Sequence, residues 1–386
     1  MTRRERLMAT LRGEPVDRPP VCFYGVGDPG QDPTDSDPFN VYNDPSWRPL
    51  LELARAEADL IVMRRVPFVC TGDDPMKAIK TSQIWNDGNG SRFFKTTIRA
   101  GERELTALNR QDRDLNTIWT VEHLLKDTHD LTAWLELPHL SAVGEPDVRN
   151  VLETEARLED AGIVMLETPD PFGLIAGLFH MADYTLIGVM ENALMHRALE
   201  RVLEYLLRRV EAVCRKLPGR LWRIAGPEYA APPYLPPHLF EEYVVRYVTP
   251  IIKAIQRDGG YARLHSHGRL LHILDHIAAT GCDALDPIEP PPLGDVDLEY
   301  VRTRYGKQMV LFGNLQGHEV FMLPSDVFAA KVAKALQEGT QGEGRGFVLT
   351  PSDPPVARKL PDRVVRNHET MVMMARQFQM PPCASK

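Results

Sequence analysis

Long apolar runs are absent from this sequence of 386 residues. No segment approaches the roughly 20 consecutive apolar residues that a membrane-spanning helix requires. The first residues, Met1–Arg12, carry charges where a secretory signal peptide would have its apolar region. We therefore expect a cytoplasmic protein without a membrane segment.

Basic clusters and paired cysteines are also scarce. The net charge is −8 and no run of Lys and Arg exceeds a dipeptide, which argues against a nucleic-acid or anionic-membrane partner. The cysteines have no CxxC spacing, so we expect reduced thiols outside any disulfide framework. They are Cys22, Cys70, Cys214, Cys282 and Cys383. Walker A, GxSxG and HExxH motifs are absent, so the sequence lacks the signatures of P-loop NTPases, α/β-hydrolases and zincins.

Short apolar runs alternate with helical patterns along most of the chain, as in proteins with parallel β/α architecture. Eight such runs are present, and eight is the number of strands that closes a TIM barrel. We therefore predict an α/β fold, a (β/α)8 barrel formed by a single domain over residues 1–386. The candidate strands are Pro20–Tyr24, Leu60–Phe68, Gly162–Thr168, Leu221–Ala225, Tyr261–His267, Ala284–Ile288, Met309–Phe312 and Phe347–Thr350.

Two further patterns refine this prediction. Thr2 and Glu5 have the spacing of a capping box, and the apolar period from Leu199 to Val213 predicts a long helix that ends before Pro218. Between residues 81 and 121 the pattern changes to short strands separated by Gly and Asn turns. We expect a β-hairpin meander there, inserted after the second strand as a flap over one barrel mouth.

His265 and His267 are the most informative candidates for a functional site. Residues two apart on a strand point to the same face, so both imidazoles can project into the mouth where TIM barrels carry their active sites. Two neutral imidazoles are a start for a Zn²⁺ site, which needs three protein ligands and an open position. The alternative is that one or both are hydrogen-bonded core groups or donors to a substrate.

Acidic side chains at other strand ends can complete such a site. Glu228 and Asp353 stand out because neighbouring prolines restrain their loops, and we take them as catalytic candidates. Any single carboxylate can instead be a solvated loop residue or a helix N-cap. The candidates for binding substrate are Glu167, Asp286, Asn314 and Arg223.

Several segments resemble the uroporphyrinogen decarboxylase superfamily. The opening Arg4–Pro20 is similar to the start of these proteins, and the likeness continues through Leu264-His-Ser-His-Gly268, Gly281-Cys-Asp283, Leu311-Phe-Gly-Asn314 and Gly346–Pro355. The resemblance implies a (β/α)8 barrel. It also implies one of two activities, the decarboxylation of haem biosynthesis or zinc-dependent methyl transfer with a corrinoid protein.

Departures from the family pattern separate these two branches. The decarboxylases carry arginine in the loop after strand one, whereas Cys22–Gly30 contains none, and their essential aspartate falls at Arg64 and Arg65. The methyltransferases have His-x-Cys after strand five, where His265 matches and His267 replaces the cysteine. Their further cysteine after strand eight falls at Ser352 or Asp353.

The sequence therefore favours a methyltransferase-like enzyme. We expect Zn²⁺ or another divalent metal at His265 and His267, completed by Glu228 or Asp353, with a small-molecule methyl donor or acceptor. No Asp-x-His-x-x-Gly segment occurs, so a corrinoid would arrive on a partner protein. A homodimer is also compatible with the sequence. The alternatives are a decarboxylase with a rebuilt site and a non-catalytic barrel subunit.

Overall fold

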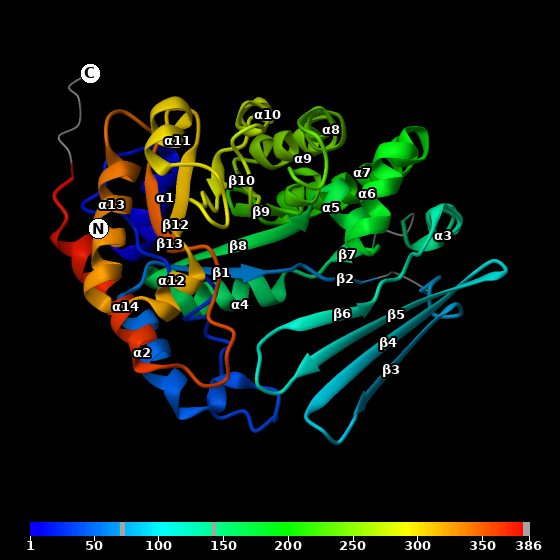
Figure 1. The fold of residues 1–386 in the computed structure, drawn as a ribbon, viewed down its shortest axis with the longest axis horizontal. Helices are drawn as coiled ribbons and strands as arrows, with labels where there is room; N and C mark the ends of the chain where they lie inside the picture. The colour runs from blue at the N-terminus through cyan, green and yellow to red at the C-terminus, as the bar shows by residue number, and fades with distance from the viewer. Residues whose placement is uncertain (70–73, 141–143, 381–386) are drawn as a thin grey trace.

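A seven-stranded parallel sheet organises the protein, as the computed structural model shows for residues 1–69, 74–140 and 144–380. The sheet order is β1-β8-β9-β10-β11-β12-β13, and each neighbouring pair is parallel (Figure 1). The strands are β1 (Leu60–Arg64), β8 (Gly162–Pro169), β9 (Leu221–Ala225), β10 (Tyr261–His265), β11 (Ala284–Asp286), β12 (Val310–Leu315) and β13 (Phe347–Pro351). This confirms the α/β class and seven of the predicted strands.

The first predicted strand, Pro20–Tyr24, is reduced to a bridge. Val21 pairs in parallel with Leu349 of β13. Leu349 N donates to Pro20 O and Cys22 N donates to Leu349 O, both at 2.9 Å. On the other side, Asp59 N donates to Val21 O at 2.8 Å, just before β1 begins. Pro19 and Pro20 lack the N–H groups that a longer ladder would need.

The predicted strand Leu60–Phe68 is wrong in its second half. β1 ends at Arg64, and Phe68–Val69 forms β2, which pairs antiparallel with β7 (Glu145–Pro146) in a separate sheet. Pro67 lies between the two strands and cannot donate to a ladder. The strand predicted over Tyr261–His267 is also too long, because the chain bends after Ser266 and Gly268 has a left-handed φ of 84°.

Most of the helices cover the outer face of the parallel sheet. The predicted capping box is present on α1, where Thr2 Oγ1 accepts from Glu5 N. The long periodic segment forms α7, which begins at Asn192 and so is about two turns longer at its start than the predicted period from Leu199. The helices are α1 (Arg3–Arg12), α2 (Arg48–Glu57), α3 (Thr128–Leu135), α4 (Arg149–Leu158), α5 (Pro171–Ala176), α6 (Met181–Met190), α7 (Asn192–Lys216), α8 (Pro237–Phe240), α9 (Arg246–Arg257), α10 (Leu274–Ala279), α11 (Leu298–Tyr305), α12 (Gly317–Met322), α13 (Ser325–Thr340) and α14 (Asp362–Gln377). Among the described residues, no helix has both the length and the apolar character needed to cross a bilayer.

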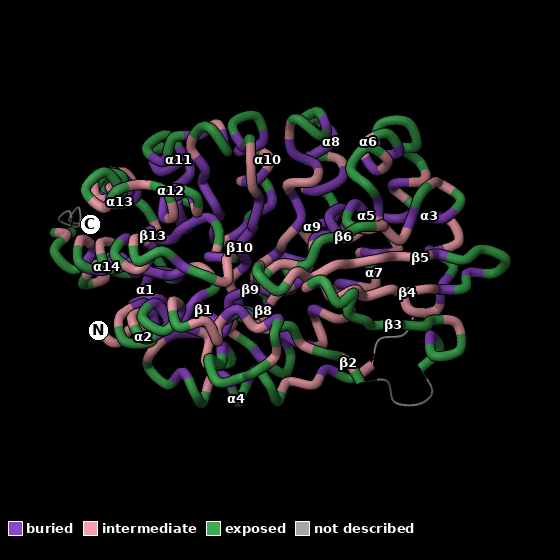
Figure 2. Tube along the Cα trace, turned by 60° about the horizontal axis from the view of Figure 1, so that its bottom comes forward, coloured by how far each residue is buried: buried purple, intermediate pink, exposed green. Residues whose placement is uncertain are grey.

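Two apolar clusters fill the space on either side of the strands. The larger one joins the outer strand faces to the helices and includes Val62, Leu166 and Leu264. The smaller one lies on the inner face and includes Cys22, Met165 and Phe312. This division follows the two-residue alternation of strands, and Figure 2 shows the parallel strands as the most buried part of the chain.

The predicted meander is confirmed as a four-stranded antiparallel sheet. Its strands are β3 (Lys80–Asn86), β4 (Ser91–Ala100), β5 (Arg103–Asp112) and β6 (Ile118–Glu122), in the order β3-β4-β5-β6. The turn between β5 and β6 contacts the segment that follows β13, through a bridge from Leu115 to Ala357 and a 2.7 Å bond from Asn116 N to Val356 O. The meander therefore lies beside the carboxyl ends of the parallel strands, apart from the sheet itself (Figure 1).

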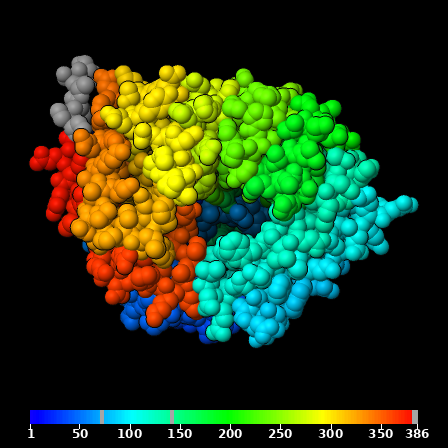
Figure 3. Space-filling view, in the orientation of Figure 1, coloured from blue at the N-terminus to red at the C-terminus, as the bar shows by residue number. Residues whose placement is uncertain are grey.

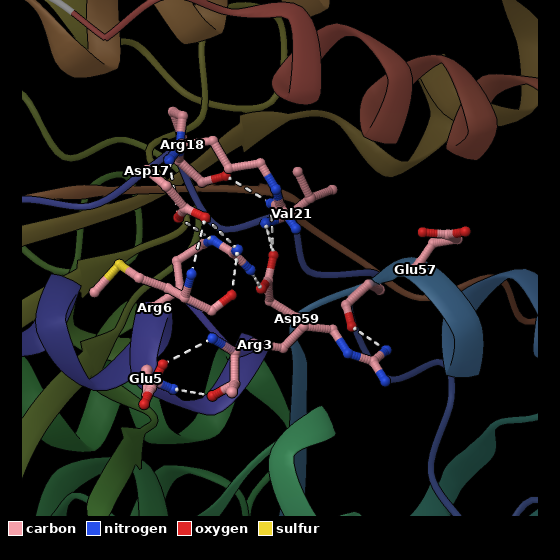
Figure 4. Close-up of polar contacts among 12 residues, drawn as sticks. Arg3, Glu5, Arg6, Asp17, Arg18, Val21, Glu57 and Asp59 are labelled. Atoms are coloured by element: carbon pink, nitrogen blue, oxygen red, sulfur yellow. Dashed lines mark hydrogen bonds and ion pairs between the residues drawn. The ribbon is translucent and has the colours of Figure 1, made fainter.

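A buried carboxylate ties the N-terminal segment to the sheet. Asp59 is fully buried and accepts from Arg6 Nη1 at 2.6 Å, Arg18 Nη1 at 2.8 Å and Val21 N at 2.8 Å (Figure 4). Arg6 also binds Asp17 through Nε and Nη2. This network joins α1, the Val21 bridge and the start of β1.

Of the predicted free thiols, Cys22, Cys214 and Cys282 are free and buried. Cys70 and Cys383 lie outside the described residues.

Candidate active site

Charged side chains gather on the inner face of the sheet near the carboxyl ends of its strands. Successive inner-facing residues along the strands change from the apolar cluster to a polar layer toward the carboxyl ends. This layer begins at Arg263 on β10 and Arg223 on β9. The space-filling view shows a hollow at the centre of the molecule, ringed by segments from many parts of the chain (Figure 3). This layer contains all of the predicted site residues that lie on strands.

His265 ends β10 and is held by a buried ion pair. Its side chain is buried, and Nδ1 lies 2.7 Å from Asp286 Oδ2. Asp286 also binds Arg263, whose Nε lies 2.5 Å from Oδ1 and whose Nη2 contacts Oδ2. Burial lowers the pKa of His265, and the attraction of Asp286 offsets this only in part. The imidazole is therefore a neutral group with one ring nitrogen engaged.

His267 lies two residues further, where the chain has left the strand. Its Nδ1 is 3.2 Å from Glu289 Oε2, which also accepts from Gly268 N at 2.9 Å. Burial lowers the pKa of His267, but the Glu289 hydrogen bond and the negative charges of Glu289, Asp353 and Glu228 outweigh it, so the net pKa is raised. The two histidine rings are 4.6 Å apart and nearly perpendicular.

The structure brings both catalytic candidates near His267. Glu228 follows β9, and its Oε2 accepts from Gly226 N at 3.1 Å within its own turn. Asp353 follows β13, and its Oδ2 accepts from Ser352 Oγ at 2.7 Å. Both carboxylates raise the pKa of His267 through their charge, so they belong to its surroundings.

The predicted substrate-binding residues divide into three positions. Glu167 on β8 binds Arg65 at 2.5 Å and also contacts Arg223, so these two candidates pair with each other. Asp286 is 1% exposed behind His265, where it positions the imidazole and cannot face a substrate. Asn314 lies near the end of β12, opposite Thr350 of β13.

Two residues that contribute to the site were not predicted from the sequence. Arg263 neutralises Asp286, and Tyr24 stacks on His265 with ring centroids 6.2 Å apart. The spacing Arg263-x-His265-x-His267 was the available signal, because residues two apart on one strand share a face. Tyr24 had no signal, since it comes from a segment 241 positions earlier in the chain.

The histidine pair fits part of a metal site. Each Nδ1 is bound to a carboxylate, the arrangement that orients histidine ligands so that Nε2 faces a metal. Among the described residues, no group of three His, Cys, Asp or Glu side chains is close enough to hold a metal. A third protein ligand would therefore require Glu228 or Asp353 to rotate toward the pair.

Comparison with known proteins identifies the family of this chain. Residues 164–354 match the model of uroporphyrinogen decarboxylase (URO-D). The chain belongs to the uroporphyrinogen decarboxylase superfamily. The match spans the strands from β8 to β13, and so includes both histidines.

One solved structure resembles the whole chain in fold. A methyltransferase from Methanosarcina mazei resembles the chain with a TM-score of 0.61 and 19% identity, over 98% of each chain. At this identity the likeness shows a common fold. A D-psicose 3-epimerase from Clostridium cellulolyticum H10 is more remote, with a TM-score of 0.35 and 11% identity over 64% of this chain and 91% of its own. No curated protein matches the sequence.

Proposed function

We propose that this superfamily member is a metal-dependent methyltransferase whose reaction centre is the pair His265 and His267. One observation carries the proposal: each imidazole is oriented by a carboxylate on Nδ1, and both are brought within 4.6 Å of each other at the strand ends. Carboxylate-oriented histidines are typical of catalytic metal sites. We propose Zn²⁺, with Glu228 or Asp353 as the third ligand.

The chain's own residues would prepare the two ligands. Asp286 holds a proton on His265 Nδ1 and so leaves Nε2 as a lone-pair donor, while Arg263 keeps Asp286 ionised. Glu289 does the same for His267. When bound, the metal supplies Lewis acidity for a substrate heteroatom. Tyr24 lies beside the His265 ring, with the ring centroids 6.2 Å apart.

Two finer proposals accompany this function. We propose that Pro20–Cys22 acts as the eighth strand and closes the sheet into a barrel, supported by its bonds to Leu349 and by the Asp59 bond to Val21. We also propose that the methyl group is exchanged with a corrinoid carried by a partner protein. The resemblance to the methyltransferase branch supports this partner, and the carboxyl ends of the strands are where it would dock.

Metal titration of tag-free protein tests the centre. We expect one Zn²⁺ per chain by calorimetry and elemental analysis. His265→Ala and His267→Ala should each weaken binding by at least tenfold, because a lost imidazole leaves too few ligands. His272→Ala, at an exposed histidine, is the matched control. Zn²⁺ binding that survives both site variants, or no binding at all, would overturn the metal proposal.

Glu228→Gln and Asp353→Asn then identify the third ligand, because an amide is a poorer ligand of the same shape. The competing activity is decarboxylation of uroporphyrinogen. We expect no coproporphyrinogen, since Cys22–Gly30 has no arginine and Arg65 and Arg223 are paired with Glu167. Turnover near the typical enzyme rate of about 10 s⁻¹ would favour the decarboxylase instead.

A further inference from the structure

A cavity of about 520 Å³ passes around the edge of β1. Its lining includes Ile61, which packs against the inner cluster, and Val62, which belongs to the outer core. Consecutive strand residues point to opposite faces of a sheet. A cavity that touches both must therefore run past the edge of β1 that is not paired with β8. That edge faces the segment from Cys22 to Gln31, which also lines the cavity.

The inner end of the cavity reaches the layer below His265. Tyr24, Arg263 and Phe312 line it there. Arg263 lies over the Phe312 ring at 4.4 Å and pairs with Asp286, while Tyr24 stacks on His265. A molecule at this end would lie beside the Tyr24 ring, which stacks on His265. The cavity is a lateral approach to the reaction centre.

The outer end is bounded by an ion pair. Arg64 Nη1 lies 2.5 Å from Asp28 Oδ2 and Nη2 lies 2.8 Å from Oδ1, and Arg64 Nε donates to Thr154 Oγ1 at 2.9 Å. Arg64 and Asp28 both line the cavity. Since their side chains are only 14% and 27% exposed, the pair forms a partly buried boundary between the cavity and solvent.

The lining indicates which class of molecule fits. Its charged groups are already paired, Arg64 with Asp28 and Arg263 with Asp286. Between them lie mainly apolar or aromatic side chains, including Ile61, Met165 and Phe312. An ionised ligand would enter without a counter-charge, and burying an uncompensated charge is costly. A volume of this size accommodates a small organic molecule.

A nucleotide is a poor candidate although Gly25, Gly27 and Gly30 have the spacing of a phosphate-binding loop. That motif works by placing phosphate at the N-terminus of the helix that follows directly. Here the next helical turn begins at Val41, and Asp28 carries a negative charge inside the loop. Phosphate would be repelled rather than bound.

We propose that this lateral cavity binds a small, neutral, largely apolar organic molecule and admits it to the inner side of His265, with the Arg64–Asp28 pair as its outer boundary. The proposal deepens the proposed function, and it rests on that function only in taking His265 as the reaction centre. It assigns the substrate to an approach beside β1.

Two fluorinated probes of matched size test the binding step in metal-free protein. By ¹⁹F NMR we expect 4-fluorotoluene to bind once per chain, and 4-fluorobenzoate at least tenfold more weakly because of its charge. Ile61→Phe, which fills the cavity, should weaken 4-fluorotoluene at least tenfold, while Ile61→Val should retain binding. Circular dichroism and the melting temperature establish that both variants fold.

The rate of probe exchange tests the role of the Arg64–Asp28 pair as the outer boundary of the cavity. Arg64→Ala should accelerate exchange of 4-fluorotoluene severalfold, and Arg48→Ala, at an exposed ion pair, should leave it unchanged. Equal binding of the two probes, or binding insensitive to Ile61→Phe in folded protein, would overturn the proposal, as would no binding at millimolar probe. None of these readouts uses metal or turnover, so they are independent of the zinc titration.

Discussion

At the scale of single residues, the environment makes two neighbouring histidines different. His265 and His267 are two positions apart, yet the pKa of the first is lowered and that of the second raised. Burial lowers the pKa of both histidines. Burial is the larger effect at His265, whereas at His267 the hydrogen bond to Glu289 and the charges of Glu289, Asp353 and Glu228 outweigh it. A site with one neutral and one readily protonated imidazole results.

This difference predicts separate titrations in metal-free protein. NMR of the histidine rings should show His267 titrating above the reference pKa of about 6.5 and His265 below it. Since the folded pKa of His267 is raised, its contribution to stability is full at low pH and is lost as pH rises through that pKa. Glu289→Gln should move the His267 titration downward, because it removes a charge and a hydrogen-bond acceptor.

Assignment by His267→Asn and His265→Asn provides the control for that experiment. If both rings titrated together near the reference value, the charge arrangement around His267 described above would be wrong.

At the scale of elements, the Asp59 network decides how the N-terminal segment joins the sheet. A single buried carboxylate accepts from two arginines and from a backbone amide, and these three donors come from α1 and from the segment that ends in the Val21 bridge (Figure 4). Removing one partner from a buried ion pair leaves an uncompensated charge. The attachment of α1 therefore depends on Asp59.

Asp59→Asn should lower the free energy of unfolding by about 3–5 kcal/mol, the usual effect of breaking a buried pair. Hydrogen exchange should also accelerate at the amide of Val21 and along α1. Glu57→Gln is a matched control, because the pair of Glu57 with Arg376 is exposed and should contribute at most about 1 kcal/mol. Urea unfolding of both variants measures the difference, and a loss at Asp59→Asn no larger than the control would contradict this view.

At the scale of the whole molecule, buried histidine couples stability to pH. His368 on α14 is 1% exposed and packs edge-on against Phe23, with the ring centroids 4.5 Å apart. Its Nδ1 donates a hydrogen bond to Val364 O at 2.7 Å. Its buried Nε2 has no hydrogen-bond partner among the described residues. Burial lowers its pKa to about 4. Protonation of this group therefore favours the unfolded chain.

The direction of this pH dependence follows from the linkage between proton binding and unfolding. Between pH 6.5 and about 4 the unfolded chain binds a proton at this position and the folded chain does not, so stability falls as pH decreases through this window. The loss should reach about 3 kcal/mol. Urea unfolding at pH 7 and pH 4.5 should show a smaller decrease for His368→Leu than for the parent protein, and an unchanged decrease for His272→Ala. A pH dependence identical in all three proteins would exclude His368 as its source.

The sequence by itself determined the elements that depend on local patterns. The capping box at Thr2 and Glu5, the periodic helix α7 and the Gly/Asn turns of the meander each follow from interactions between residues close in the chain. Seven strands were predicted for the same reason. The two-residue spacing of His265 and His267 was sufficient to place both at one end of β10.

Only the tertiary structure decided what surrounds those residues. Asp286, predicted to meet a substrate, lies behind His265 because Arg263 and the imidazole converge on it from the neighbouring strand. Val21 forms a bridge rather than a full strand because its partners Leu349 and Asp59 come from distant segments. Such contacts depend on how the strands register with one another, and charge pairing across the sheet has no signature in a local pattern.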